Sequence, residues 1–186
     1  MRVKSRWNVK GRERTPEEVA GALAFIAWRI AGNGVLNLEN EDFQTDTQAQ
    51  RLDVMAEMLA FLIHLVDRLA YGRVEEDGRR RYVATLGLRL ADIMQDNRID
   101  AQGDGDYRAE FVALLNERMD DYAEMSFSGA EPGFAMRRYL AEKVAAAMGP
   151  RHNKWIAQQV IDIEVPEAME TLGKALRNLL PAADAG

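Results

Sequence analysis

The stretch Arg51–Tyr71 reads RLDVMAEMLAFLIHLVDRLAY, and it decides the fold of this 186-residue chain. An α-helix turns by about 100° per residue, so the polar side chains of this stretch gather on one stripe roughly 100° wide. The stripe consists of Asp53, Glu57, Ala60, His64, Asp67, Arg68 and Tyr71. The rest of the helix surface is apolar, whereas an ordinary surface helix has a narrow apolar stripe and a broad polar face. The sequence therefore predicts a central helix, over about residues 43–71, that other helices surround.

A helix is predicted before the central one. Thr15-Pro16-Glu17-Glu18 supplies an N-cap residue, a proline at the first helical position and acidic side chains in the first turn. This helix is expected to end near Ala31, because Gly32-Asn33-Gly34 is typical of a helix end.

Apolar periodicity and stop signals predict the helices that follow. They are expected over about 77–95, 106–125, 134–148 and 166–180. The segment from Asn153 to Val165 either forms a helix that breaks before Pro166 or is extended over 160–165. The chain is therefore predicted to be all-α, a single-domain bundle of about six helices over residues 15–180. Residues 181–186 are expected to form a flexible C-terminal tail.

Residues 1–14 form a basic N-terminal arm with a different pattern. Val3, Trp7 and Val9 alternate with charged or polar side chains, which is the period of a β-strand. Val35–Glu39 alternates in the same way, so a short strand pairing between the arm and this segment is predicted. The alternative is a frayed N-terminus.

Charge is distributed unevenly between the arm and the rest of the chain. The arm carries a net charge of +5, which leaves −11 for the remaining residues. Such an arm could bind nucleic acid, but the only other basic run is Arg79–Arg81, which disfavours that partner. It could also pack on the acidic surface of its own or a second subunit. Because aromatic residues often anchor interfaces, Val3, Trp7 and Val9 are the candidate interface residues of a homo-oligomer, expected to be a dimer.

Composition excludes several classes of protein. Apolar residues make up 47% and charged residues 29% of the chain, values typical of a soluble globular protein. The absence of cysteine excludes disulfide scaffolds, thiolate zinc sites and cysteine nucleophiles. No apolar segment of a secretory signal follows Met1, and the apolar run 54–70 is too short and too often interrupted to span a bilayer. The sequence thus favours a cytoplasmic, acidic protein that does not bind membranes.

The polar stripe of the central helix contains the candidate ligand-binding residues. They are Glu57, His64, Asp67, Arg68 and Tyr71. Side chains three and four positions apart are neighbours on a helix, so a carboxylate could orient His64 while Arg68 holds an anionic ligand. The alternative is that these side chains pair locally and only stabilise the fold.

Metal and cofactor sites are not predicted. A di-metal carboxylate bundle needs Glu-x-x-His on two helices, and neither His64 nor His152 follows a glutamate by three positions. A single histidine such as His64 on an apolar helix is more often a core residue than a haem ligand. Asp100–Asp106 resembles the first half of a calcium loop, but the closing position holds Phe111 instead of glutamate. The segment is therefore expected to be a turn whose Asp104 or Asp106 caps the next helix.

Two functional hypotheses follow. The first is a helical protein without catalytic activity that acts by association, with itself or with a protein partner. The second is a helical bundle that binds a small molecule in a pocket along the polar stripe. Motifs for phosphate binding and for nucleophilic catalysis are absent from the sequence, so a reaction that needs only acid–base groups is the remaining catalytic alternative.

Overall fold

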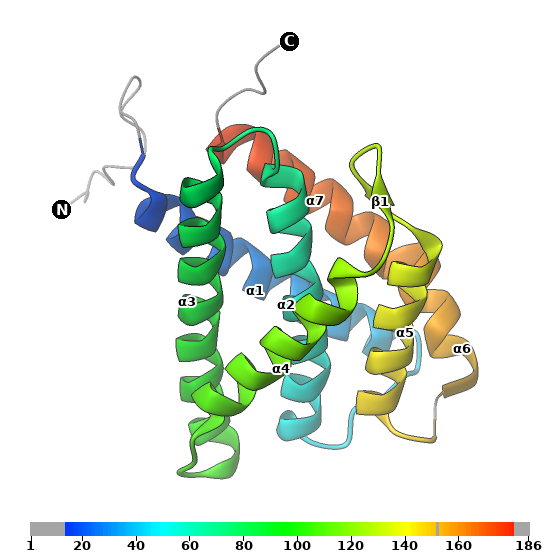
Figure 1. Cartoon of the computed structure of the whole chain (residues 1–186). Coiled ribbons are helices and arrows are strands. Elements are labelled where there is room, and N and C mark those ends of the chain that lie inside the picture. The colour runs from blue at the N-terminus through cyan, green and yellow to red at the C-terminus, as the bar shows by residue number, and fades with distance from the viewer. Residues whose placement is uncertain (1–13, 152, 181–186) are drawn as a thin grey trace, which may run out of the picture.

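The computed structural model describes residues 14–151 and 153–180 (Figure 1). Its elements, in chain order, are α1 (Pro16–Asn40), α2 (Gln48–Ala70), α3 (Glu76–Gln102), α4 (Tyr107–Ala123), β1 (Phe127–Ser128), β2 (Glu131–Pro132), α5 (Phe134–Met148), α6 (Asn153–Gln159), the π-helix η2 (Val160–Glu164) and α7 (Val165–Leu179). The predicted all-α, single-domain bundle is confirmed. The candidate interface residues Val3, Trp7 and Val9, and the tail 181–186, lie outside the described residues.

Helix α2 forms the centre of the bundle, as predicted. It packs against α1, α3, α4, α5 and α7, and in Figure 1 it stands between α3 and α5 while α4 crosses in front. Leu62, Leu65 and Val66 are almost completely buried. The helix begins a few residues later than predicted because Thr47 caps it, its hydroxyl accepting a hydrogen bond of 3.1 Å from the backbone N–H of Gln50.

Helix α1 is longer than predicted. It continues through Gly32-Asn33-Gly34 and ends at Asn40, although glycine inside a helix costs about 1 kcal/mol relative to alanine. Packing explains the difference, because a Cβ on Gly34 would lie 2.8 Å from the sulfur of Met58 on α2. The missing side chain lets the two helices approach closely.

The predicted strand pairing of the N-terminal arm with Val35–Glu39 is wrong, because these residues belong to α1. The strand pair of the described chain lies instead between α4 and α5, where β1 and β2 are antiparallel. Gly129 and Ala130 connect them with φ angles of 60° and 65°, the left-handed values that a tight hairpin turn requires.

The chain does not break before Pro166 but stays helical from α6 into α7. Residues 160–164, for which an extended conformation was one prediction, form a π-helical turn, and the backbone N–H of Val165 bonds to the carbonyl of Val160. Proline has no N–H to donate, and its ring crowds the carbonyl four residues earlier. A wider turn before Pro166 accommodates both effects. The proline then stands in the first turn of α7, as predicted.

The segment that resembles a calcium loop is mostly helical. Helix α3 runs to Gln102 and ends at Gly103, which has a φ of 85°. Asp100 and Gln102 are therefore on a helix rather than in a ligand loop. Asp106 caps α4 as predicted, accepting a hydrogen bond of 3.2 Å from the backbone N–H of Ala109.

By length and composition, α1 could cross a membrane. Its most apolar window has a mean hydropathy of 1.5, and 44% of that window is buried. Core helices of soluble proteins and signal sequences near the N-terminus have the same properties. In the structure, α1 packs against α2, α3 and α7.

Candidate functional site

Glu57, the first predicted ligand-binding residue, forms a buried ion pair. Both of its carboxylate oxygens accept hydrogen bonds from Arg118 on α4, at 2.7 and 2.9 Å. Glu57 and Arg118 each expose only 7% of their surface. Such a two-pronged pair satisfies both charges inside the bundle, so Glu57 connects α2 to α4 and is not free to bind a ligand.

His64 is buried and neutral. Its Nε2 accepts a hydrogen bond of 3.3 Å from Arg68 Nε, so the proton of the neutral ring is on Nδ1. Burial, together with the nearby charge of Arg68, lowers the pKa of His64 to about 4. The ring lies 5.3 Å from that of Tyr122. Arg68 also donates to the carbonyl of Ala123 at the end of α4.

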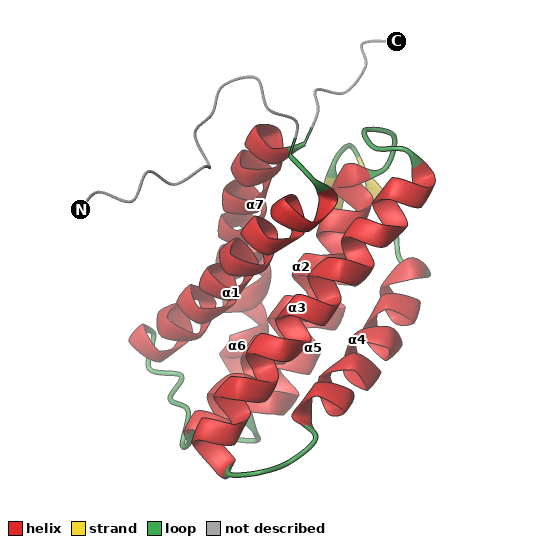
Figure 2. Cartoon of the chain, turned by 90° about the vertical axis from the view of Figure 1, so that its left-hand side faces the viewer, coloured by secondary structure: helices red, strands yellow, loops and turns green. Residues whose placement is uncertain are grey.

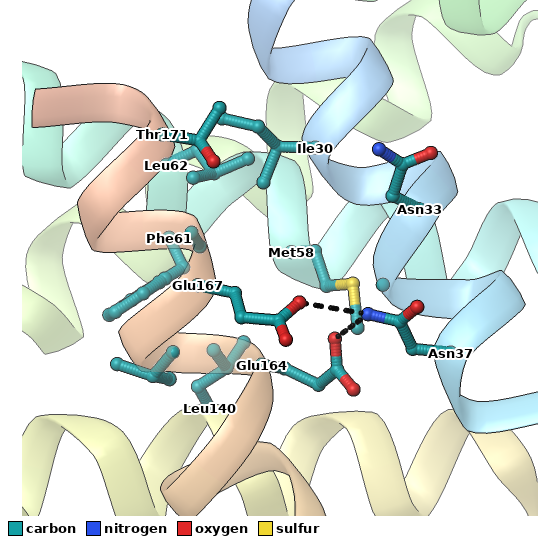
Figure 3. Close-up of a pocket in the computed structure, with 13 residues that line it drawn as sticks. Ile30, Asn33, Asn37, Met58, Phe61, Leu62, Leu140, Glu164, Glu167 and Thr171 are labelled. Atoms are coloured by element: carbon teal, nitrogen blue, oxygen red, sulfur yellow. Dashed lines mark hydrogen bonds between the residues drawn. The ribbon is translucent and has the colours of Figure 1, made fainter. Parts of the chain in front are cut away.

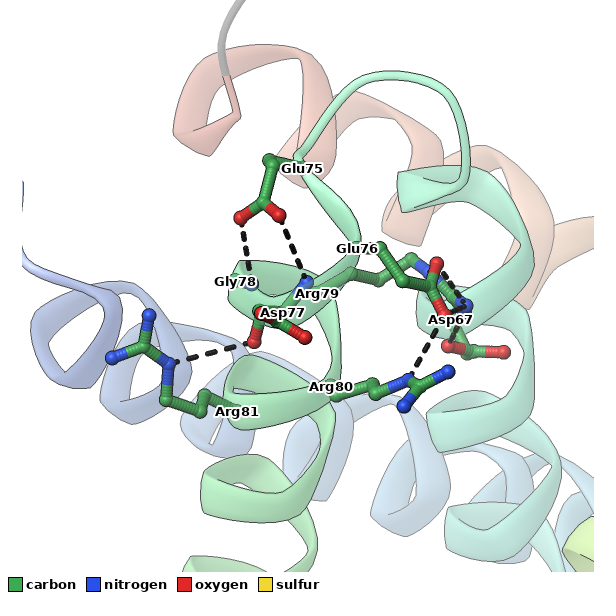
Figure 4. A network of polar contacts seen from close by, with 8 residues as sticks. All are labelled: Asp67, Glu75, Glu76, Asp77, Gly78, Arg79, Arg80 and Arg81. Carbon is green, nitrogen blue, oxygen red and sulfur yellow. Dashed lines mark hydrogen bonds and ion pairs between the residues drawn. The ribbon is translucent and has the colours of Figure 1, made fainter.

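Asp67 and Tyr71 face the beginning of α3 instead. Asp67 pairs with Arg79, which also bonds to Glu76 in the first turn of α3 (Figure 4). Tyr71 is exposed, with the Arg79 guanidinium 5.4 Å from its ring centre. The structure therefore divides the predicted stripe into two sets of contacts, one with α4 and one with α3. His64 and Arg68 pair within the stripe, as the alternative prediction has it, whereas Glu57 and Asp67 pair with Arg118 on α4 and Arg79 on α3.

A different site lies on the adjacent face of α2, where α1, α2, α5, η2 and α7 line a cavity of about 80 Å³ (Figure 3). Its walls are mainly apolar. The apolar lining residues are Ile30, Met58, Phe61, Leu62, Leu140, Val165 and Ala168. The polar lining residues are Asn33, Asn37, Glu164, Glu167 and Thr171. None of the five predicted stripe residues lines this cavity.

Glu164 is the buried polar group of the cavity, with 7% of its surface exposed. One carboxylate oxygen accepts a hydrogen bond from Asn37 Nδ2 and the other from Gln159 Nε2, both at 3.1 Å. Burial raises the pKa of Glu164, and the charges of Glu167 and Glu41 add to this effect, while the two amide hydrogen bonds oppose it.

Asn37 connects two carboxylates across the cavity edge. Its Nδ2 also donates to Glu167 Oε2, again at 3.1 Å (Figure 3). Both hydrogens of this amide group are therefore directed at acids. No Arg, Lys or His whose side chain the structure describes, which leaves out residues 1–13 and 152–154, forms an ion pair with Glu164 or Glu167. Glu57 is as deeply buried as Glu164 but has Arg118 as its counterion.

The sequence contained a signal for this site that periodicity does not reveal. Gly34 and Pro166 disfavour helix, yet both lie within continuous helical segments. Gly34 lines the cavity, and Pro166 follows the π turn that ends with Glu164. Single π-helical turns inside α-helices are frequent at functional sites. Gly34 and Pro166, which both disfavour helix and yet stand inside helices, therefore lie at or next to the cavity.

Comparison of the chain with protein-family models, with curated proteins and with solved structures gives no match. Among the described residues, no group of three or more His, Asp or Glu side chains could hold a metal ion.

Proposed function

We propose that this protein binds a small organic molecule in the cavity between α1, α2 and α7. The supporting observation is the combination of an apolar wall with polar side chains that converge on one edge, which is the usual composition of a small-molecule site. The proposal keeps the predicted class of function, a helical bundle with a ligand pocket. It moves the pocket from the polar stripe to the adjacent face of the central helix.

The proposed function is binding of the small molecule without a chemical reaction. The hydrogen bonds between polar lining residues join the amide of Asn37 to the carboxyl groups of Glu164 and Glu167, and Gln159, outside the lining, donates to Glu164. A nucleophile activated by a base would require a different arrangement.

The experiment uses Met58, whose side chain lines the cavity. Protein labelled with ¹³C at the methionine methyl groups is titrated with compact organic molecules of about three to five non-hydrogen atoms, and the Met58 signal is assigned with Met58→Leu. We expect at least one compound to shift this signal in a saturable way. Ala168→Leu, which fills the cavity from α7, should abolish the shift. The matched control is Ala146→Leu at an exposed position of α5, which should leave it unchanged. A saturable shift that survives in Ala168→Leu would place binding elsewhere and refute the proposal.

Self-association is a second candidate function, and the outer face of α3 supports it. Leu88 is 46% exposed and lies between two grooves. A groove of about 270 Å³ between α1 and α3 includes Phe25 and Trp28. Another of about 500 Å³, between α3 and α4, includes Val112. Figure 2 shows α3 between α1 and α4 on this face.

The exposed side chain of Leu88 lies beside both grooves. In a two-fold symmetric dimer, Leu88 of each copy could therefore enter a groove of the other copy. The test is the mass in solution, measured by light scattering across a concentration series. Leu88→Glu should shift a dimer toward monomer, while Phe134→Glu, a matched change at an exposed residue of α5, should not. A chain that is monomeric at all concentrations would exclude this candidate.

A further inference from the structure

We infer that the ligand of the cavity is a small amine in its ammonium form, with a short apolar body. This inference rests on the proposed function. The observation that carries it is that Glu164 and Glu167 meet at the cavity edge and share the amide of Asn37, without a basic partner among the described residues.

The charge of the cavity edge favours a cationic ligand. A buried carboxylate requires a counterion or several hydrogen bonds, because removing it from water is costly. Glu57 obtains the counterion from Arg118, whereas Glu164 has two amide hydrogen bonds and a second acid nearby. A ligand with a positive charge would offset both acids and take the role that Arg118 has at Glu57.

Hydrogen bonding at the cavity edge also favours an ammonium group. The amide of Asn37 donates to Glu164 and to Glu167, so both of its hydrogens are in use. The free hydrogen-bonding capacity beside these two acids is that of carboxylate oxygens, which only accept. Asn33 and Thr171, the other polar lining residues, also carry donors, so the two acids rather than the whole lining favour a donor. An ammonium group offers up to three N–H donors and no acceptor. An anionic ligand would meet two negative charges there.

The size and the walls of the cavity limit the rest of the ligand. Apolar side chains from α1, α2, α5 and α7 form the walls, so the body of the ligand should be hydrocarbon. A cavity of about 150 Å³ accommodates benzene, and this one has about 80 Å³. At the same volume per atom this cavity encloses about three carbons, so the alkyl end of a four-carbon amine fills it and the ammonium end reaches the edge at Glu167, which is exposed. n-Butylamine is therefore the probe, and 1-butanol and butyrate are its neutral and anionic analogues.

The experiment measures the Kd of each probe from the Met58 methyl signal at pH 7. We expect n-butylamine to bind at least tenfold more tightly than 1-butanol and butyrate to give no saturable shift. Glu164→Gln has the same shape without the charge and should weaken n-butylamine at least tenfold while leaving 1-butanol unchanged. Glu167→Gln, at an exposed position, should act in the same direction without affecting folding. Glu142→Gln on α5, where Glu142 pairs with Arg138, removes the same charge outside the cavity and should leave both Kd values unchanged.

The outcomes separate the two proposals. If 1-butanol binds as tightly as n-butylamine, or if neither glutamine variant weakens the amine, the amine inference is wrong while the binding function stands. If none of the three probes shifts Met58 and the wider set of compounds also fails, both proposals are wrong.

Discussion

Gly34 of α1 lies against Met58 of α2 so closely that a Cβ at position 34 would be 2.8 Å from the methionine sulfur. The same Cβ would lie 3.5 Å from a carboxylate oxygen of Glu164. The absence of a side chain at one position therefore determines both how two helices pack and how much space the cavity retains.

Gly34→Ala should weaken ligand binding with little loss of stability. Alanine gains about 1 kcal/mol of helix propensity, while the new methyl group displaces the flexible end of Met58 toward the cavity. We expect the free energy of unfolding in urea to change by less than about 1 kcal/mol and the Kd of n-butylamine to rise at least tenfold.

Gly32→Ala is the matched control for that experiment. A Cβ on Gly32 would meet only the methyl carbon of Met55, at 3.9 Å, which is an ordinary contact. This variant should gain about 0.5–1 kcal/mol of stability and keep its affinity. Equal affinities of the two alanine variants would show that Gly34 does not determine the space in the cavity.

Arg118→Met should destabilise the protein by about 3–5 kcal/mol, because it leaves Glu57 buried without its counterion. The double variant Glu57→Gln with Arg118→Met removes both charges and should be more stable than Arg118→Met alone. Urea unfolding of the wild type, both single variants and the double variant gives the coupling energy between the two residues. A coupling near zero would mean that Glu57 and Arg118 do not stabilise each other inside the bundle.

Leu62→Ala should cost about 2–5 kcal/mol, because Leu62 is almost completely buried on the central helix. Leu36→Ala, a change of the same size at a residue that is 47% exposed, should cost less than about 1 kcal/mol. Thermal and urea unfolding measure both. Similar costs for the two variants would contradict the central position of α2.

The sequence predicts most of the fold because most of it depends on local patterns. The apolar surface of residues 51–71 predicts a central helix, and Asp106 and Gly149 mark helix ends that the structure retains. The predictions that proved wrong concern Gly34 and the residues before Pro166, where local preference favours a break. At Gly34, packing against Met58 outweighs the cost of glycine in a helix, and before Pro166 the π turn removes the conflict with proline.

Gly34 and Pro166 indicate where the cavity lies only once both are known to stand inside helices, and the pairing of the polar site residues could not be predicted because they are distant in the sequence. Asn37 and Glu164 are separated by 127 positions, and neither belongs to a motif or to the polar stripe. The stripe residues were recognisable because they share one helix, but the ion partners of Glu57 and Asp67 are on α4 and α3. Spacing on one helix shows which side chains are neighbours, and it does not show which helix they face.

Lowering the pH should reduce stability through His64. Its pKa is about 4 in the folded protein and 6.5 in the unfolded chain, so the unfolded chain binds more protons between these values. The free energy of unfolding therefore decreases as the pH falls from about 6.5 toward 4. Between pH 7 and pH 5 the loss should be about 1–2 kcal/mol, allowing for partial screening by solvent.

Glu164 acts in the opposite direction, since its raised pKa lets the folded protein bind a proton more readily than the unfolded chain. The contribution of His64 must therefore be isolated by comparison with His64→Gln, whose side-chain oxygen can still accept the hydrogen bond from Arg68. Urea unfolding at several pH values should show a loss of stability between pH 7 and pH 5 that is larger in the wild type by about 1–2 kcal/mol. Parallel pH profiles for the two proteins would mean that the imidazole is protonated as easily in the folded bundle as in the unfolded chain. In that case His64 would have access to water, and the polar stripe of α2 would again be a candidate for ligand binding.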